Sequence, residues 1–313
     1  MRGILRKLAG AVLTLLAVTL LVFLAFRLIP GDPVTALLGT EITPERAAQL
    51  RAEMGLDDPL LVQYGRWVIH ALGGDLGTSY SYSMPVSSML AGKLPITLTM
   101  SLMAFVLSIA LAIPLGILAA KHEGRIFDRV LLALCQVIMA IPPFFSGILL
   151  TYIFGIVLRW FTPGGFISYE RDMVGFLRYL ILPAVAIALP KAAMAAKLLR
   201  DSVIEEAGKD YVRTAYSRGN ATMEVMYRHV LRNAILPVVT FLGMALADMV
   251  AGSIVVEQVF GIPGISRILL TSISNRDYPV VEAIILGIAG LVVVANLLVD
   301  LLYRLLDPRL REA

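Results

Sequence analysis

The sequence predicts an all-α integral membrane protein with six transmembrane helices and both termini in the cytoplasm. Hydrophobic residues make up 58% of the 313 residues and charged residues only 16%, whereas about a quarter of a soluble domain is charged. The mean hydropathy is +0.82. Because apolar residues run along the whole chain, too little polar surface remains to face water, and one membrane domain over residues 1–313 is expected.

Long apolar segments give the positions of the spans, since a spanning helix needs about 20 such residues. The six predicted spans are residues 8–29, 95–120, 129–158, 179–200, 235–258 and 280–303. The first follows a basic start, but it is longer than the apolar part of a signal peptide, so we expect a retained helix. Residues 30–94 then form an insertion, residues 95–303 a five-helix core, and residues 304–313 a tail.

The basic residues fix the expected orientation. They gather at the N-terminus, after the second span, between the fourth and fifth spans, and at the C-terminus. Cytoplasmic loops of membrane proteins carry this excess of lysine and arginine. Residues 201–234 are therefore expected in the cytoplasm and residues 30–94 outside. This bias accounts for the net charge of +4, so nucleic-acid binding is a poor hypothesis.

The outer segment contains two short predicted helices. Thr43 and Pro44 are typical of a helix start, and Gly55 of its stop. A second, amphipathic helix follows Asp58 and Pro59. We expect this second helix to lie at the membrane interface, to pack on the bundle, or to help form a docking surface for a partner.

No motif for catalysis or metal binding is present. The sequence has no GxxxxGK[ST], HExxH or GxSxG pattern, its three histidines are scattered, and its one cysteine, Cys135, lies in an apolar run. We therefore expect no enzyme activity, no metal site and no cofactor in this chain.

Polar and kinked positions within the spans are candidates for a translocation path. Prolines such as Pro142 and Pro143 free helix carbonyls, which indicates either a packing kink or a path-lining element. Asp248 lies mid-span, where a carboxylate is costly. It is expected to line a polar path, to accept a hydrogen bond from a neighbouring helix, or to be protonated. Met244, one turn earlier, completes the predicted path residues.

Between the fourth and fifth spans, about thirty polar residues predict a helix–turn–helix in place of a short loop. Residues 203–218 favour a helix that Gly219 ends in the left-handed conformation, and Asn220 or Thr222 would cap a second helix. The side chains expected to be exposed are Tyr211, Arg213, Tyr216 and Arg218. Such a stiff projection suits the grip of another protein.

This stretch, "DYVRTAYSRGNATMEVMYRHVLRNAILP", resembles the cytoplasmic EAA loop of ABC-importer permeases, in the version of the dipeptide/oligopeptide/nickel family. Other phrases resemble that family in order and spacing, among them "FRLIPGDPV", "GDLGTSYSYSMPV", "VVEQVFGIPGISR" and "NRDYPVV". The similarity runs nearly end to end and is strongest for the B-type permease subunit.

The resemblance implies a type I importer permease in the prokaryotic inner membrane. Its partners would be a C-type permease, two cytoplasmic ATPases that bind ATP and magnesium, and an extracytoplasmic substrate-binding protein. The implied ATPase-coupling residues are Tyr211, Val212, Arg213, Thr214, Ala215, Tyr216, Arg218, Gly219, Leu236 and Pro237. The implied binding-protein contacts are Phe260, Pro263, Gly264, Arg276, Asp277 and Tyr278.

The expected function is ATP-driven import of dipeptides or oligopeptides. An alternative within the family is import of nickel or another metal chelate. An alternative of another class is a stand-alone secondary carrier or channel that uses Asp248 as its coupling site.

Overall fold

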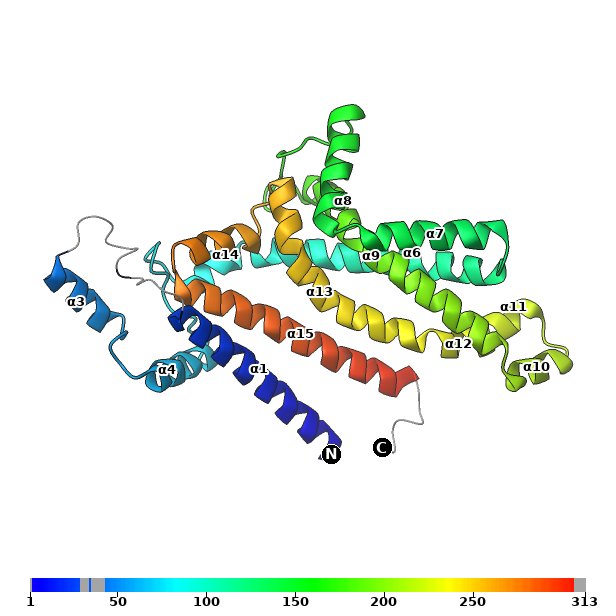
Figure 1. Ribbon diagram of the computed structural model, residues 1–313, viewed down its shortest axis with the longest axis horizontal. Helices are drawn as coiled ribbons and strands as arrows, with labels where there is room; N and C mark the ends of the chain where they lie inside the picture. Colours follow the sequence, from blue (N-terminus) through cyan, green and yellow to red (C-terminus); the bar gives the residue numbers. More distant parts are fainter. Residues whose placement is uncertain (1, 29–33, 35–42, 307–313) are drawn as a thin grey trace. The chain divides into compact units, whose positions relative to one another are not determined.

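The computed structural model describes residues 2–28, 34 and 43–306, and these residues are almost entirely helical (Figure 1). Its elements are α1 (Arg2–Leu28), α3 (Pro44–Glu53), α4 (Leu60–Leu72), α5 (Val86–Ala91), α6 (Leu94–Lys121), α7 (Ile126–Ala140), α8 (Pro143–Leu150), η1 (Thr151–Val157), α9 (Met173–Ala207), α10 (Asp210–Ser217), α11 (Thr222–Glu224), η2 (Val225–Val230), α12 (Leu231–Ala234), α13 (Leu236–Phe260), α14 (Ile265–Ser274) and α15 (Tyr278–Leu306). The elements η1 and η2 are π-helical. Part of the predicted outer insertion and of the tail, residues 29–33, 35–42 and 307–313, lies outside the described residues.

Within the described residues, five helices are long and apolar enough to cross a membrane, and a bent pair supplies a sixth candidate. The five lie within Ala9–Leu28, Val86–Lys121, Met173–Ala207, Leu236–Phe260 and Tyr278–Leu298. These helices confirm the predicted all-α membrane fold class. The orientation of the termini stays a prediction.

The third predicted span, 129–158, is not one straight helix. It consists of α7 and the run of α8 and η1, which are bent by 102° at the break between them. Proline explains the break: Pro143 begins α8, and Ile141 before the proline pair has an extended backbone at ψ 121°. The sequence located the prolines but did not predict a bend of this size.

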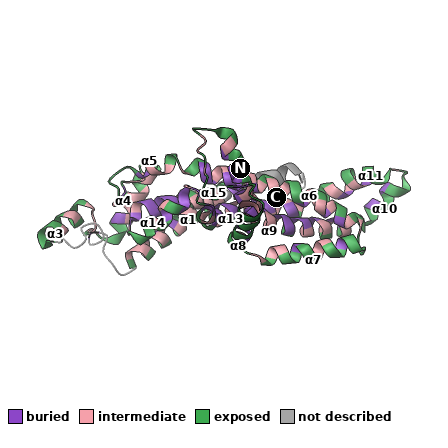
Figure 2. Cartoon of the chain, turned by 90° about the horizontal axis from the view of Figure 1, so that it is seen from above, coloured by how far each residue is buried: buried purple, intermediate pink, exposed green. Residues whose placement is uncertain are grey.

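The chain forms two compact units. The first comprises residues 1–96 and 263–293, and the second comprises residues 97–262 and 294–313. In the second unit α9 is the central helix, and it packs against α7, α8, α12 and α13. It also lies close to α6, because a side chain at Gly116 would come within 2.9 Å of the Ala196 carbonyl oxygen. The outer face of α7 is exposed, and its buried residues among those described are Asp128 and Cys135 (Figure 2).

The first unit contains the predicted outer helices. Thr43 caps α3 by accepting from the Arg46 amide at 3.3 Å, and Gly55 has φ +64°, as the sequence predicted. The amphipathic α4 packs on α1, where the hydroxyl oxygens of Tyr64 and Thr19 lie 2.9 Å apart. The structure therefore confirms packing on the bundle, while the expected positions at the membrane interface and in a docking surface stay predictions.

Candidate functional site

The 208–235 segment has the predicted helix–turn–helix, with a difference in each helix. The predicted helix over 203–218 is broken at Gly208 and Lys209, so that its first part is the end of α9 and its second part is α10. Helix α10 ends at Ser217, and Gly219 follows with φ +83°, a conformation that glycine adopts without strain because it has no side chain. The second helix starts after Ala221, which has no side-chain cap, so the expected capping by Asn220 or Thr222 is wrong. Its middle turn, η2, is π-helical.

Helix α10 has one buried face and one open face. Val212 and Ala215 are buried in an apolar cluster together with Val203 of α9, Val225 of η2 and Val238 of α13. The exposed residues of the α10 segment are Asp210, Tyr211, Arg213, Thr214, Tyr216, Ser217, Arg218 and Gly219. Among the predicted coupling residues, Val212 and Ala215 therefore hold the helix in place, while the others remain accessible to a partner.

A polar network fixes α10 to its neighbours. The Tyr211 hydroxyl donates to the Glu206 carboxylate of α9 at 2.5 Å and accepts from the Asn233 amide of α12 at 3.0 Å. Lys209 also donates to Glu206. Sequence reasoning missed Glu206 and Asn233, because only the fold brings residues from three helices to one hydroxyl.

The network keeps Tyr211 protonated. Burial, and then the hydrogen bond to Glu206, raise the pKa of the Tyr211 hydroxyl above its ordinary value near 10. The carboxylate of Glu206 also raises the pKa of the Lys209 ammonium. Both groups are donors at physiological pH at their ordinary pKa values, and the upward shifts extend this range to higher pH.

Replacing Tyr211 by phenylalanine is expected to loosen α10. The change removes a hydrogen bond to a carboxylate, an interaction that contributes about 1.5–3 kcal/mol. Amide hydrogen exchange across 208–235 should become at least several-fold faster. Tyr216→Phe is the matched control, since its hydroxyl makes no hydrogen bond to the described residues and its ring is exposed. Equal exchange rates in the two variants would show that the network does not hold the helix.

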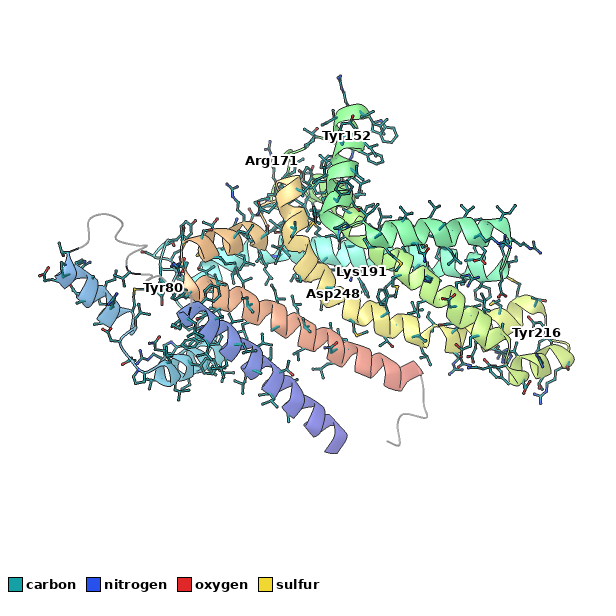
Figure 3. The ribbon with its side chains drawn as sticks, in the orientation of Figure 1. Tyr80, Tyr152, Arg171, Lys191, Tyr216 and Asp248 are labelled. Carbon is teal, nitrogen blue, oxygen red and sulfur yellow. The ribbon has the colours of Figure 1, made fainter. Side chains whose placement is uncertain are left out.

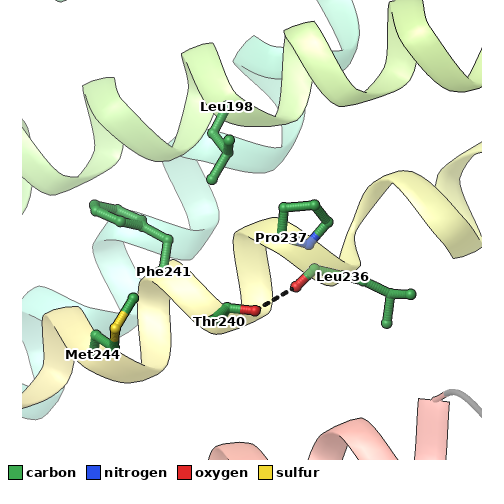
Figure 4. A pocket seen from close by; sticks show the side chains of 6 residues that line it. All are labelled: Leu198, Leu236, Pro237, Thr240, Phe241 and Met244. Atoms are coloured by element: carbon green, nitrogen blue, oxygen red, sulfur yellow. Dashed lines mark hydrogen bonds between the residues drawn. The ribbon is translucent and has the colours of Figure 1, made fainter. Parts of the chain in front are cut away.

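Leu236 and Pro237 lie at the start of α13, directly after α12. They line an open pocket of about 470 Å³ between α9 and α13 (Figure 4). Its other lining residues are Leu198, Thr240, Phe241 and Met244. Two predicted coupling residues and one predicted path residue, Met244, thus line one cavity.

Asp248 accepts a hydrogen bond from a neighbouring helix, one of its three expected states, and the donor is a lysine that the sequence did not identify. The Lys191 ammonium donates to its carboxylate at 2.9 Å, and the two side chains meet between α9 and α13 (Figure 3). Since α9 extends over Met173–Ala207, Lys191 lies near its middle. Lys191 also lies near the middle of the predicted fourth span, 179–200, but it was not among the predicted path residues. Pro190, which directly precedes Lys191, was the feature of the sequence that could have marked this position.

The remaining predicted residues lie apart from these groups. Pro142 and Pro143 lie at the α7–α8 bend. Among the predicted binding-protein contacts, Phe260, Gly264, Asp277 and Tyr278 are buried, whereas Pro263 and Arg276 are partly exposed. Asp277 accepts from the Ser79 hydroxyl at 2.5 Å and from the Tyr80 amide at 2.9 Å, and so holds the turn before α5. A docking role for these residues stays a prediction.

Comparison with known proteins adds a family assignment. Residues 112–312 match the family of the binding-protein-dependent transport system inner membrane component, and residues 1–101 match its N-terminal membrane component. A probable peptide ABC transporter permease protein of Sinorhizobium fredii is 36% identical over 308 residues, covering 98% of each chain. The dipeptide transport system permease protein DppB of Escherichia coli K12 is 36% identical over 335 positions, covering 99% of this chain and 98% of DppB. The chain therefore belongs to the multi-pass inner membrane permeases of binding-protein-dependent transport systems.

Proposed function

We propose that this protein is a permease subunit of an ATP-driven importer of dipeptides or oligopeptides. The end-to-end similarity to permeases named for peptide and dipeptide transport supports this substrate class. A second permease chain, two cytoplasmic ATPases and an extracytoplasmic binding protein would complete the machine. The ATPases would bind ATP and magnesium, and this chain would carry no cofactor of its own.

The open face of α10 is the observation that best supports a role of this helix in coupling to the ATPases. Its partly exposed aromatic rings, Tyr211 and Tyr216, stand beside the exposed Arg213 and Arg218 on a helix whose other face is buried. Aromatic and arginine side chains are enriched where proteins bind each other. The helix is thus fixed to this chain and open to a second one.

The chain order supports transmission of motion from this surface. Helix α9 runs without a break to Ala207, two residues separate it from α10, and α12 leads directly into α13. A push on α10 by a closing ATPase would therefore act on the cytoplasmic ends of two packed spanning helices. Such motion would switch the path between its inward-facing and outward-facing states.

Reconstitution tests the proposal. The full complex, purified through a tag on this chain and placed in proteoliposomes with its binding protein, should take up labelled alanyl-phenylalanine only with ATP. Unlabelled dipeptides should compete for uptake, and a nickel–histidine complex should not. Purification of this chain without an ATPase, or uptake that proceeds without ATP, would contradict the importer and favour a stand-alone carrier.

A further inference from the structure

The Lys191–Asp248 pair differs from two other ion pairs that join spanning helices. In the Asp128–Arg200 and Glu282–Arg27 pairs the carboxylate is buried. The Asp248 side chain, by contrast, is 68% exposed and lies at the middle of α13. Among the residues that the structure describes, Lys191–Asp248 is the ion pair whose carboxylate is exposed at the middle of a spanning helix.

The exposure of Asp248 belongs to a continuous stripe along α13. Met244, Asp248, Ala251, Val255 and Gln258 are all exposed, and their spacing of three and four residues places them on one helix face. A carboxylate at the centre of a span costs about 3 kcal/mol or more when it faces lipid. The stripe therefore faces a water-filled path or another protein chain.

The surroundings of the pair suit a variable organic cargo. Met194 on α9 and Met244 on α13 are exposed one turn from the charged residues. Methionine side chains adapt to different shapes and are common on binding surfaces that accept many ligands. Beyond Met244 lies the 470 Å³ cavity with its apolar lining, which is within the usual volume range of ligand pockets, about 300–1,000 Å³.

We propose that Lys191 and Asp248 bind the two charged termini of a short peptide in the transport path. Asp248 accepts from the peptide ammonium, Lys191 donates to the peptide carboxylate, and the adjoining cavity takes an apolar side chain. The inference rests on the proposed function and adds a substrate site to it. In the absence of cargo the two residues neutralise each other, which lowers the cost of keeping charges within the membrane.

The geometry allows this exchange. A dipeptide spans roughly 7 Å when extended, more than the 2.9 Å that joins the Lys191 and Asp248 atoms, so the pair must open. The flexible four-carbon stem of lysine lets its ammonium swing away from Asp248. Asp248 then pairs with the peptide ammonium in place of Lys191, and Lys191 pairs with the peptide carboxylate in place of Asp248. No charge is left unpaired when the peptide enters.

The test combines variants with cargo changes in the reconstituted complex. Uptake is measured for alanyl-phenylalanine, its N-acetyl form and its C-terminal amide, at saturating concentrations. For Asp248→Asn, the ratio of free to acetylated peptide uptake should fall about tenfold, as expected when an interaction between charged groups is removed. For Lys191→Gln, the ratio of free to amidated peptide uptake should fall by a similar factor. The preference of the binding protein among the three peptides does not affect the comparison of wild type with variant, because both are assayed with the same binding protein.

A second readout needs no binding protein. In a Cys135→Ser background, Met244→Cys gives this chain one thiol beside the pair, since Cys135 is its only native cysteine. Millimolar alanyl-phenylalanine should slow maleimide labelling of that thiol in the nucleotide-free complex. The acetylated and amidated peptides should protect the thiol several-fold less.

Controls separate a substrate site from a structural bridge. Asp201→Asn makes the same change on the neighbouring helix α9 and should leave both uptake ratios unchanged. Asp248→Glu keeps the carboxylate and should have the wild-type ratio. Equal losses for all three cargoes, together with equal thiol protection, would overturn the inference and make the pair a structural bridge between α9 and α13. Absence of ATP-dependent peptide uptake in the wild-type complex would instead overturn the proposed function.

Discussion

Replacing Gly219 by aspartate is expected to abolish coupled uptake while the protein still inserts in the membrane. Gly219 has φ +83°, and no heavy atom lies within 4 Å of the point where a Cβ atom would stand, so aspartate fits sterically. The new carboxylate follows the exposed Arg218 directly in the chain and changes the charge of the proposed ATPase-binding surface. Uptake should fall at least about tenfold, as expected when an interaction between charged groups is disrupted. Uptake and binding-protein-stimulated ATP hydrolysis are the measurements.

Gly164→Asp is the matched control for this variant. Gly164 has φ +75° and equally open space, and it lies in the turn before α9, far along that helix from α10. The Gly164→Asp substitution therefore adds the same charge and a similar backbone strain, about 1–2 kcal/mol or less for aspartate in the left-handed region. If Gly219→Asp transports as well as Gly164→Asp, α10 is not the coupling element.

Replacing Asp128 by alanine should produce the largest loss of stability. Both Asp128 carboxylate oxygens accept from the Arg200 guanidinium at 2.6 Å, and one also accepts from the Gly124 amide at 2.9 Å. The side chains are only 2% and 15% exposed. Removing one partner leaves a buried charge with a single remaining ion pair, to Asp201, and should cost about 3–5 kcal/mol. Thermal unfolding of the detergent-solubilised complex should shift down by several degrees.

An exposed ion pair of the same unit provides the comparison. Arg228 and Glu224 lie 3.2 Å apart with side chains 76% and 45% exposed, so Glu224→Gln should change stability by about 0.5 kcal/mol or less. The double variant Asp128→Ala with Arg200→Met should recover part of the loss, since no buried charge is then left. A similar small shift for Asp128→Ala and Glu224→Gln would contradict a role for the buried pair.

The Asp128–Arg200 pair also bears on function through its place in the chain. It joins the first turn of α7 to the last turns of α9, and α9 continues to the anchor of α10 at Glu206. Because the pair is bidentate, it fixes the orientation of the Arg200 guanidinium against the Asp128 carboxylate. We expect it to keep the α9 end rigid when α10 is pushed.

Features that depend on neighbouring residues could be predicted from the sequence. Apolar length located the spanning helices, because a helix in lipid satisfies its own backbone. Thr43 with Pro44 began a helix, and Gly219 ended one, because capping and left-handed φ are local properties of these residue types. The mid-span position of Asp248 also marked it as a candidate before its surroundings were known.

Helix packing, in contrast, determines which groups meet and which face of each helix is open. The 102° bend at Pro142 and Pro143 depends on how α7 and α8 each pack on α9. The partnership of Lys191 with Asp248 joins residues 57 positions apart, and that of Asp128 with Arg200 joins residues 72 apart. Hydropathy and motif spacing carry no information about such pairs, because a side chain's partner across two helices is set by their packing and rotation.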